Sequence, residues 1–169
     1  MLHIYHGDGK GKTTAAFGLA LRAAGHSRRV IIAQFLKSEQ SGERRSMEYV
    51  PHVLLLPLPD EIKFTFQMSV TERAECEALC MRMLDDVVRL AEEGSMVLLD
   101  EVMGALSSDM LQLDDVLDCL DALPEDCEVV LTGRNPPDQL LRRADYVTEM
   151  KLQRHPYEKG VMAREGIEY

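Results

Sequence analysis

The residues best suited to chemistry lie near the amino terminus, in the run Gly7-Asp8-Gly9-Lys10-Gly11-Lys12-Thr13-Thr14. Glycines let the backbone turn its amides toward an anion, a lysine adds positive charge, and a threonine hydroxyl can ligate magnesium at a helix N-terminus. The common pattern places its first glycine at position 6, where this chain has His6, so the leading glycine is displaced to Gly7. The run predicts a loop that binds nucleotide phosphates; a purely structural glycine turn is the alternative.

Two adjacent carboxylates, Asp100 and Glu101, follow the apolar segment Met96 to Leu99. A buried strand that ends in an acid can deliver a carboxylate to the metal beside a phosphate-binding loop. Because side chains alternate along a strand, we expect a regular strand to direct one of the two at the metal. A solvated acidic pair at a strand end is the alternative interpretation.

Further candidates stand where regular structure breaks. Arg134 follows the apolar segment Val129 to Leu131 in a glycine turn, where it could contact a phosphate or form a surface ion pair. Phe64 and Phe66 lie two positions apart in the irregular stretch from Pro57 to Met68. These rings could fill the core or form a flat apolar wall for a large ligand.

The elements expected to position these residues alternate between short apolar segments and helical stretches. The apolar segments are Leu2 to Tyr5, Val30 to Phe35, Val53 to Leu56, Met96 to Leu99, Val129 to Leu131 and Tyr146 to Val147. Such alternation is typical of a parallel sheet covered by helices. With a phosphate-binding loop after the first segment, it predicts an α/β fold of the P-loop NTPase-like (RecA-like) class, with a mostly parallel sheet flanked by helices.

The longest predicted helix runs from Val70 to Glu93. Ser69 is expected to cap its start, Glu72 completes a capping box, and Gly94 is expected to stop it.

Three other stretches resist a regular assignment. Residues 37–47 and 57–68 follow predicted strands, at the edge where open α/β sheets bind their ligands. The tail from Arg154 to Tyr169 is rich in glycine and proline and carries aromatic and basic groups. It is expected either to fold over a ligand or to fray.

The composition sets limits on the class of protein. The 169 residues predict one domain, residues 1–169, and the net charge of −10 argues against a nucleic-acid or membrane partner. The four cysteines, Cys76, Cys80, Cys119 and Cys127, form no C-x-x-C pair and are interpreted as apolar packing residues in a reducing cytoplasm. We expect no signal peptide, and no apolar run reaches the roughly 18 residues that a membrane span needs.

Taken together, these residues resemble the P-loop family of corrinoid adenosyltransferases, which act in cobalamin synthesis and salvage. The resemblance spans nearly the whole chain. It rests on residues 7–18, Gln34-Phe35-Leu36-Lys37, Gly42-Glu43-Arg44, Phe64-Thr65-Phe66, Leu99-Asp100-Glu101, Thr132-Gly133-Arg134 and the closing run Lys159-Gly160-Val161-Met162-Ala163-Arg164-Glu165-Gly166-Ile167-Glu168-Tyr169.

The resemblance implies that a cobalt(I) corrinoid attacks the 5′ carbon of ATP and expels tripolyphosphate. In this family ATP is said to lie reversed in the loop relative to ordinary P-loop enzymes. The implied ATP-binding residues are Gly7, Asp8, Gly9, Lys10, Gly11, Lys12, Thr13, Thr14 and Arg134. Thr13 and Glu101 would ligate Mg²⁺, with Asp100 close by.

The resemblance also gives roles to the aromatic pair. Lys12, Glu101, Phe64 and Phe66 would be the catalytic set. The two rings match the family's Phe-Thr-Trp pair, thought to displace the lower axial ligand of cobalt and so ease its reduction. The chain departs from the pattern at position 66, where phenylalanine replaces tryptophan.

The implied partners are ATP, a cobalamin or precursor corrinoid, a reductase that supplies electrons to cobalt, and a second copy in a homodimer. Two other functions share the same phosphate loop. One is an NTP hydrolase or kinase, which would release orthophosphate or phosphorylate an acceptor. The other is a non-catalytic ATP sensor, which would bind without turnover.

Overall fold

The computed structural model describes residues 1–167 and contains a six-stranded sheet in which all neighbouring strands are parallel. The strand order is β3-β2-β4-β5-β1-β6. The strands are β1 (Leu2–His6), β2 (Val30–Gln34), β3 (Val53–Leu55), β4 (Met96–Asp100), β5 (Glu128–Gly133) and β6 (Tyr146–Glu149). Each lies on an apolar segment that the sequence predicts as a strand, and the predicted α/β class with a mostly parallel sheet is confirmed.

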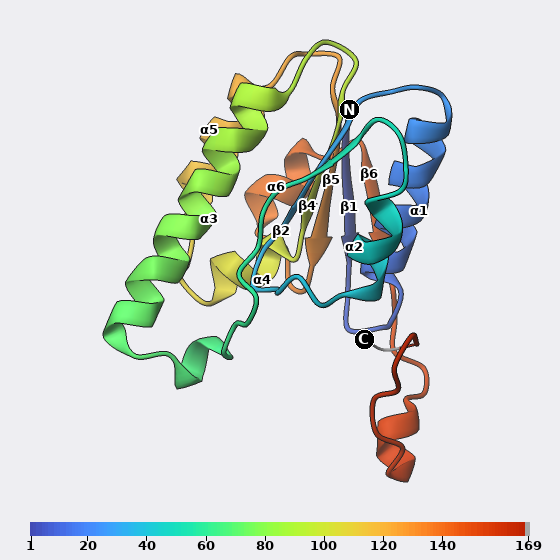
Figure 1. Cartoon of the computed structure of the whole chain (residues 1–169), viewed down its shortest axis with the longest axis vertical. Helices are drawn as coiled ribbons and strands as arrows, with labels where there is room; N and C mark the ends of the chain where they lie inside the picture. Colours follow the sequence, from blue (N-terminus) through green and yellow to red (C-terminus); the bar gives the residue numbers. More distant parts are fainter. Residues whose placement is uncertain (168–169) are drawn as a thin grey trace.

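Helices cover both faces of the sheet (Figure 1). One face carries α1 (Lys12–Gly25) and α2 (Gly42–Met47). The other carries α3 (Val70–Leu90), α4 (Val102–Ser107), α5 (Leu113–Ala122) and α6 (Asp138–Arg143). Two short 3₁₀ turns, η1 (Thr65–Gln67) and η2 (Pro156–Lys159), interrupt otherwise irregular segments.

The central strands are buried on both faces, which explains their continuous apolar sequence. Every residue of β2 and β4 is buried. In β2, Ile31 and Ala33 join the core beneath α3, whereas Val30 and Ile32 join the core beneath α1. The two hydrophobic cores therefore pack against opposite faces of the sheet and fix the position at which its strands end.

The predicted capping box of α3 is confirmed. The Glu72 amide donates to Ser69 Oγ at 3.3 Å, and the Ser69 amide donates to Glu72 Oε2 at 2.8 Å. The predicted end of this helix is wrong, because it stops at Leu90 rather than at Glu93.

The helix stops early because a serine forms the turn that follows it. The Ser95 hydroxyl accepts a hydrogen bond from the Glu92 amide at 3.0 Å, and the Ser95 amide donates to the Glu92 carbonyl at 3.0 Å. Gly94 therefore lies inside that turn, at φ +74°, instead of ending the helix.

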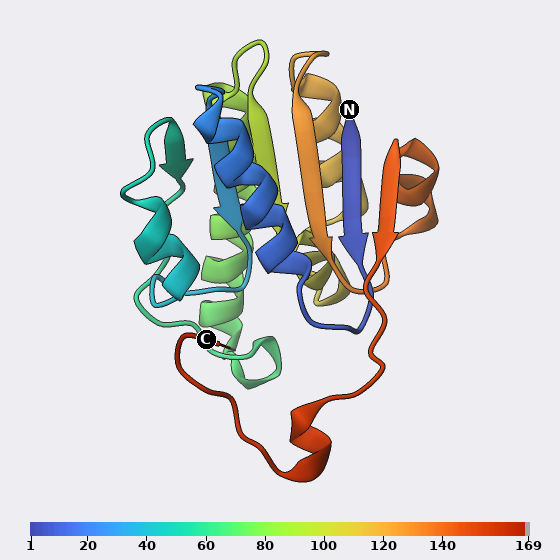
Figure 2. The ribbon, with the colours of Figure 1, turned by 90° about the vertical axis from the view of Figure 1, so that its right-hand side faces the viewer.

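The carboxyl ends of the strands meet at one edge, where the loop between β1 and α1 lies and the carboxyl-terminal tail crosses (Figure 2). Gln34 pairs with Asp100 across β2 and β4, and His6 pairs with Gly133 across β1 and β5. Of the two stretches expected to be irregular at this edge, residues 37–47 contain α2, whereas 57–68 contain no regular element except η1. Among the described residues, no helix combines the length and apolarity needed to cross a membrane.

Candidate active site

The phosphate-binding loop joins β1 to α1, and two of its glycines adopt backbone angles that other residues rarely adopt. Gly7 has φ +110° and Gly11 has φ +113°. A Cβ atom on Gly7 would lie 2.4 Å from the carbonyl oxygen of Met150, just after β6. The displaced leading glycine of the motif is therefore required both by its backbone conformation and by the close passage of this segment.

The segment after β6 also forms hydrogen bonds with polar groups of the phosphate-binding loop. The Gly9 amide donates to the Met150 carbonyl at 2.7 Å. The Leu152 amide donates to Asp8 Oδ1 at 3.0 Å, and this hydrogen bond holds the pKa of Asp8 below its usual value. Asp8 and Gly9 thus shape the loop through Met150 and Leu152.

A cavity of about 510 Å³ opens beside the loop and brings most of the predicted site residues together. Its lining consists of Lys10, Gly11, Lys12, Thr13, Thr14, Lys37, Glu43, Glu101, Arg134 and Ile167. Four cationic side chains face two carboxylates in this set, which favours a polyanion. Burial and the nearby charge of Arg134 lower the pKa of Lys12, whose Nζ donates to the Gly9 carbonyl at 2.9 Å.

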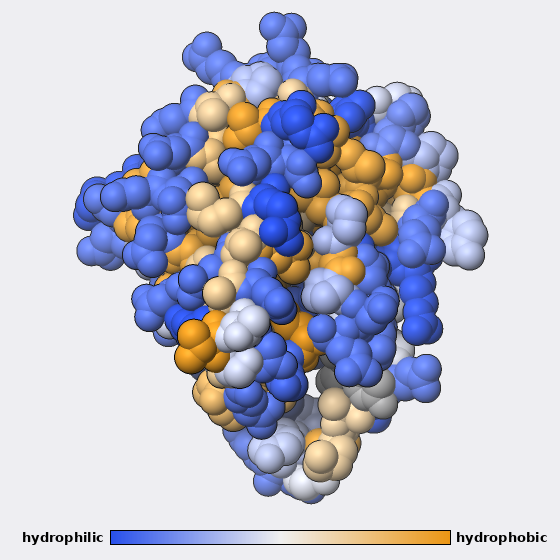
Figure 3. Space-filling view, turned by 60° about the vertical axis from the view of Figure 1, so that its left-hand side comes forward, coloured by the Kyte–Doolittle hydropathy of each residue, from blue (hydrophilic) through white to orange (hydrophobic). Residues whose placement is uncertain are grey.

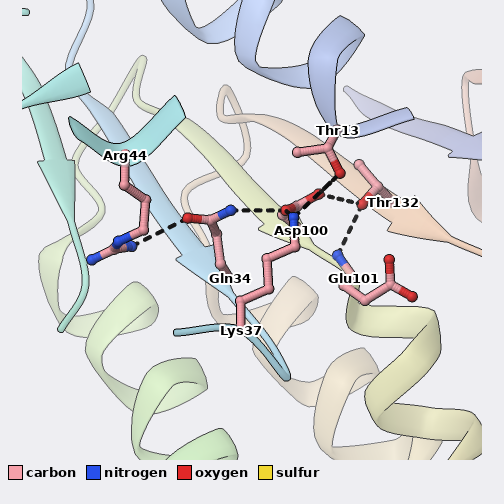
Figure 4. A network of polar contacts seen from close by, with 7 residues as sticks. All are labelled: Thr13, Gln34, Lys37, Arg44, Asp100, Glu101 and Thr132. Carbon is pink, nitrogen blue, oxygen red and sulfur yellow. Dashed lines mark hydrogen bonds and ion pairs between the residues drawn. The ribbon is translucent and has the colours of Figure 1, made fainter. Parts of the chain in front are cut away.

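Asp100 lies fully buried behind this cavity and accepts four hydrogen bonds (Figure 4). Thr13 Oγ1 and Thr132 Oγ1 donate to Oδ1 at 2.9 and 2.7 Å. Gln34 Nε2 and Lys37 Nζ donate to Oδ2 at 3.0 and 2.7 Å. Burial alone would raise the pKa of Asp100, but the charge of Lys37 and these hydrogen bonds hold it below its usual value. Asp100 is therefore a fixed anion.

Glu101 adopts the left-handed conformation, at φ +61°, where β4 gives way to α4. Its amide donates to Thr132 Oγ1 at 2.8 Å, and its side chain lines the cavity. Burial and the adjacent charge of Asp100 raise the pKa of Glu101. The two carboxylates thus differ: Asp100 anchors the network, and Glu101 faces the cavity.

Phe64 and Phe66 lie outside the phosphate cavity, at 71% and 81% exposure, so their interpretation as core residues is wrong. Their rings stack with centroids 5.5 Å apart and an angle of 13° between planes. On either side of them, Lys63 and Met68 line a second cavity of about 600 Å³ between this loop and α3. On the α3 side of the molecule, hydrophobic residues remain at the surface among hydrophilic ones (Figure 3).

The carboxyl-terminal tail returns to the phosphate loop. Lys10 Nζ donates to the Ile167 carbonyl at 2.5 Å, and Ile167 lines the phosphate cavity. Residues 168 and 169, the last two of the closing run, lie outside the described residues.

Several residues of the network received no role from the sequence. Lys37, Gln34 and Thr132 all contact Asp100, and Arg44 contacts Gln34. All four belong to the motifs that carry the family resemblance, and Gln34 and Thr132 also stand at the carboxyl ends of β2 and β5, the two strands that flank β4.

A protein-family model described as ATP:corrinoid adenosyltransferase BtuR/CobO/CobP matches residues 1–169. The chain belongs to this family. The "Corrinoid adenosyltransferase" of Escherichia coli strain K12 is 36% identical over 98% of this chain and 84% of its own length. "Corrinoid adenosyltransferase CobA" of Salmonella typhimurium gives the same figures, and the Pseudomonas aeruginosa "Corrinoid adenosyltransferase" is 33% identical over 100% of this chain and 83% of its length.

This match confirms the family resemblance found in the sequence. The protein is therefore an enzyme, a corrinoid adenosyltransferase that uses ATP to adenosylate corrinoids. The cation-lined cavity lies at the carboxyl edge of the sheet, the edge at which open α/β sheets bind their ligands. All four cysteines are buried free thiols, as their interpretation as packing residues predicts.

Proposed function

We propose that the adenosyltransferase moves the 5′-deoxyadenosyl group of ATP to the cobalt(I) of a corrinoid and releases tripolyphosphate. The electron pair of cobalt(I) forms the new bond to C5′. The bond between C5′ and its ester oxygen breaks, and the leaving tripolyphosphate takes that electron pair. The observation that carries this proposal is the cation-lined phosphate cavity in a chain of the corrinoid adenosyltransferase family.

In this proposal the phosphate loop acts by position and charge, because no proton moves at the reacting carbon. Lys10, Gly11, Lys12, Thr13, Thr14 and Arg134 contact the triphosphate, which the shared cavity supports. Gly7, Asp8 and Gly9 belong to the same binding loop and maintain its shape through Met150 and Leu152.

Thr13 and Glu101 would hold Mg²⁺, with Asp100 behind them. Hydroxyl and carboxylate oxygens are the ligands that this ion prefers. Thr13 Oγ1 donates its proton to Asp100 and accepts one long hydrogen bond from Lys37 Nζ at 3.5 Å, which leaves a lone pair for a cation. Bound Mg²⁺ would neutralise charge on the departing tripolyphosphate.

Phe64 and Phe66 would act on the corrinoid rather than on ATP. Their exposed, stacked rings offer an apolar surface that can exclude water and the lower axial ligand from cobalt. A cobalt(II) centre without that ligand is easier to reduce, because loss of an axial donor raises its potential.

The remaining partners follow from this chemistry. Cobalt(II) must gain one electron before it can attack, so we include a cellular reductase as a partner. A reducing cytoplasm suits both that step and the free thiols of the chain. We also propose a homodimer, as the family resemblance implies, and sedimentation of the intact protein at several concentrations measures its mass.

An anaerobic assay with ATP, Mg²⁺ and chemically reduced cobalamin tests the proposed reaction. The cobalt absorption spectrum reports alkylation, and ion chromatography identifies the phosphate product. We expect one tripolyphosphate for each alkylated corrinoid. Orthophosphate without alkylation would replace the proposal with an NTP hydrolase, and binding without any product would replace it with an ATP sensor.

A further inference from the structure

A continuous chain of hydrogen bonds connects the phosphate loop to the base of the aromatic loop, residues 57–68. It begins with Thr13 on Asp100 and continues from Asp100 to Gln34 Nε2 at 3.0 Å. Arg44 Nη1 then donates to Gln34 Oε1 at 3.3 Å (Figure 4). Hydrogen bonds through the Gln34 side-chain amide thus join Asp100, behind the phosphate cavity, to Arg44 of α2.

Arg44 carries the chain onward to the aromatic loop. Its Nε and Nη2 each donate to one oxygen of Glu39 at 2.9 Å, and Nη2 also donates to the Leu56 carbonyl at 2.9 Å. Glu39 Oε1 accepts a hydrogen bond from the Leu58 amide at 2.7 Å, and the Glu39 amide donates to the Pro59 carbonyl at 3.2 Å. The first residues of the aromatic loop are therefore held by the partner of Arg44.

The burial of these residues shows that the arrangement is specific. Gln34 is fully buried and Arg44 is 2% exposed. A buried guanidinium is costly unless its donors are paired, so Arg44 has little freedom to move unless Glu39 and Gln34 move with it.

The two ends of this run of hydrogen bonds are suited to coupling the phosphate cavity to the aromatic loop. At the nucleotide end, Thr13 and Lys37, which supply two of the four hydrogen bonds to Asp100, also line the phosphate cavity. At the other end, the aromatic loop lies over a cavity of about 600 Å³ and holds its two rings exposed, so it has room to shift.

We propose that Gln34, Arg44 and Glu39 are positioning residues that couple Mg·ATP binding to the placement of Phe64 and Phe66. When phosphate and Mg²⁺ bind Thr13 and Lys37, the hydrogen bonds from these two side chains to Asp100 weaken and the one from Gln34 strengthens. The resulting shift of Gln34 reaches Leu58 through Arg44 and Glu39. The aromatic pair then takes its working position after ATP has bound. This inference rests on the proposed role of the two rings toward the corrinoid.

A tryptophan reporter tests the coupling, because the chain contains no tryptophan. In the full-length Phe66→Trp variant, fluorescence and its quenching by iodide are measured with and without Mg·ATP, in the absence of corrinoid. We expect Mg·ATP to change the emission or the quenching of Trp. In the same background, Arg44→Met or Gln34→Leu is expected to abolish the change while the Kd for Mg·ATP shifts by less than about fivefold, the lower bound of a typical coupling.

The matched control is Arg45→Met, which removes the same side chain from the next, exposed position of α2 and is expected to leave the response intact. Arg44→Lys keeps the charge but loses the two-oxygen contact with Glu39, so it is expected to restore little of the response. If Arg44→Met fails to fold, Glu39→Gln gives the same test from the other side of the pair.

Turnover separates this inference from the proposed function. Arg44→Met is expected to slow the reaction from cobalt(II) about tenfold relative to the reaction from cobalt(I), with little change in KM for ATP. A wild-type enzyme that makes tripolyphosphate while the reporter ignores Mg·ATP, or a reporter that still responds in Arg44→Met, would overturn the coupling. A wild-type enzyme that makes no alkylated corrinoid would instead refute the proposed reaction.

Discussion

Thr13 Oγ1 donates a 2.9 Å hydrogen bond to Asp100 Oδ1 and so joins the first turn of α1 to the end of β4. The strand order places β4 beside β2 and β5, which supply Gln34 and Thr132 as further partners of Asp100. One buried carboxylate therefore fixes three strands and one helix relative to each other at the nucleotide site.

We expect Asp100→Asn to lower the free energy of unfolding by roughly 3 kcal/mol, because it leaves Lys37 and the hydroxyl donors without their anion. Urea denaturation measures this loss, and Asp126→Asn, at an exposed loop position, is the control.

Comparison of the wild type with Asp100→Asn also tests how stability depends on pH. The pKa of Asp100 is lowered in the folded state, so its contribution is present above the unfolded pKa of about 4 and is lost as pH falls further. We expect the stability of the wild type and of Asp100→Asn to converge toward low pH. A difference between them that does not depend on pH would contradict this assignment.

The raised pKa of Glu101 predicts an unusual pH dependence of metal binding. Burial and Asp100 raise its pKa, so it keeps its proton at pH values where an ordinary glutamate has lost it. We expect Mg²⁺-dependent ATP binding to weaken as pH falls through this raised pKa. Calorimetry in buffers of different ionisation enthalpy is expected to show proton release when the magnesium complex forms.

Glu101→Gln is expected to remove that pH dependence and to reduce turnover about 100-fold. The control is Glu43→Gln, which removes the other carboxylate of the same cavity and is expected to retain the pH dependence. A wild-type binding curve with the midpoint of an unperturbed glutamate would count against the raised pKa.

Lys12→Ala is expected to reduce turnover by about 100-fold to 1000-fold, even when the corrinoid is supplied as cobalt(I). The reason is that the side chain neutralises the leaving group in the alkylation step itself. Stopped-flow measurement of cobalt alkylation tests this, with the exposed Lys151→Ala as the control. Normal alkylation of cobalt(I) by the variant would exclude Lys12 from this role.

Phe66→Ala is expected to slow the reaction from cobalt(II) about tenfold, which for a one-electron couple corresponds to about 59 mV. It is expected to leave the reaction from cobalt(I) and the stability unchanged, because the ring is 81% exposed. Phe66→Trp is expected to speed the reaction from cobalt(II). Tyr49→Ala, which removes a ring that is 85% exposed, is the control. Equal losses from both starting states would refute the assigned role.

Gly7→Ala tests the displaced glycine of the phosphate loop. Its Cβ would meet the Met150 carbonyl at 2.4 Å, and its φ of +110° adds backbone strain. We expect a loss of about 1–3 kcal/mol in stability and weaker ATP binding by calorimetry. Gly18→Ala, at a helical position with open space around it, is expected to stabilise the fold by about 0.5–1 kcal/mol. Full ATP affinity in Gly7→Ala would show that the loop tolerates a side chain there.

Much of the fold could be predicted because its signals are local. The apolar segment from Met96 to Leu99 has to be buried on both faces, and the capping pair Ser69 and Glu72 acts within one helical turn. The end of α3 was missed because a hydrogen bond from the Glu92 amide to Ser95 overrode the usual stop signal at Gly94.

The site could be predicted in part, for the same physical reason. Residues 10–14 of the loop belong to one contiguous motif, and they do share a cavity with Glu101. Arg44 could not be recognised as a network residue, because Leu56 becomes its neighbour only after β2 and β3 pair. The exposure of Phe64 and Phe66 likewise depends on the path of a loop that has no periodic pattern.

The hydrogen bond between Gly9 and Met150 has a consequence for biosynthesis. A ribosome makes the nucleotide loop well before the backbone at Met150 that braces it. A nascent polypeptide released before Met150 would carry the complete phosphate motif without its brace. Capacity to bind ATP should therefore arise only after Met150 has been synthesised.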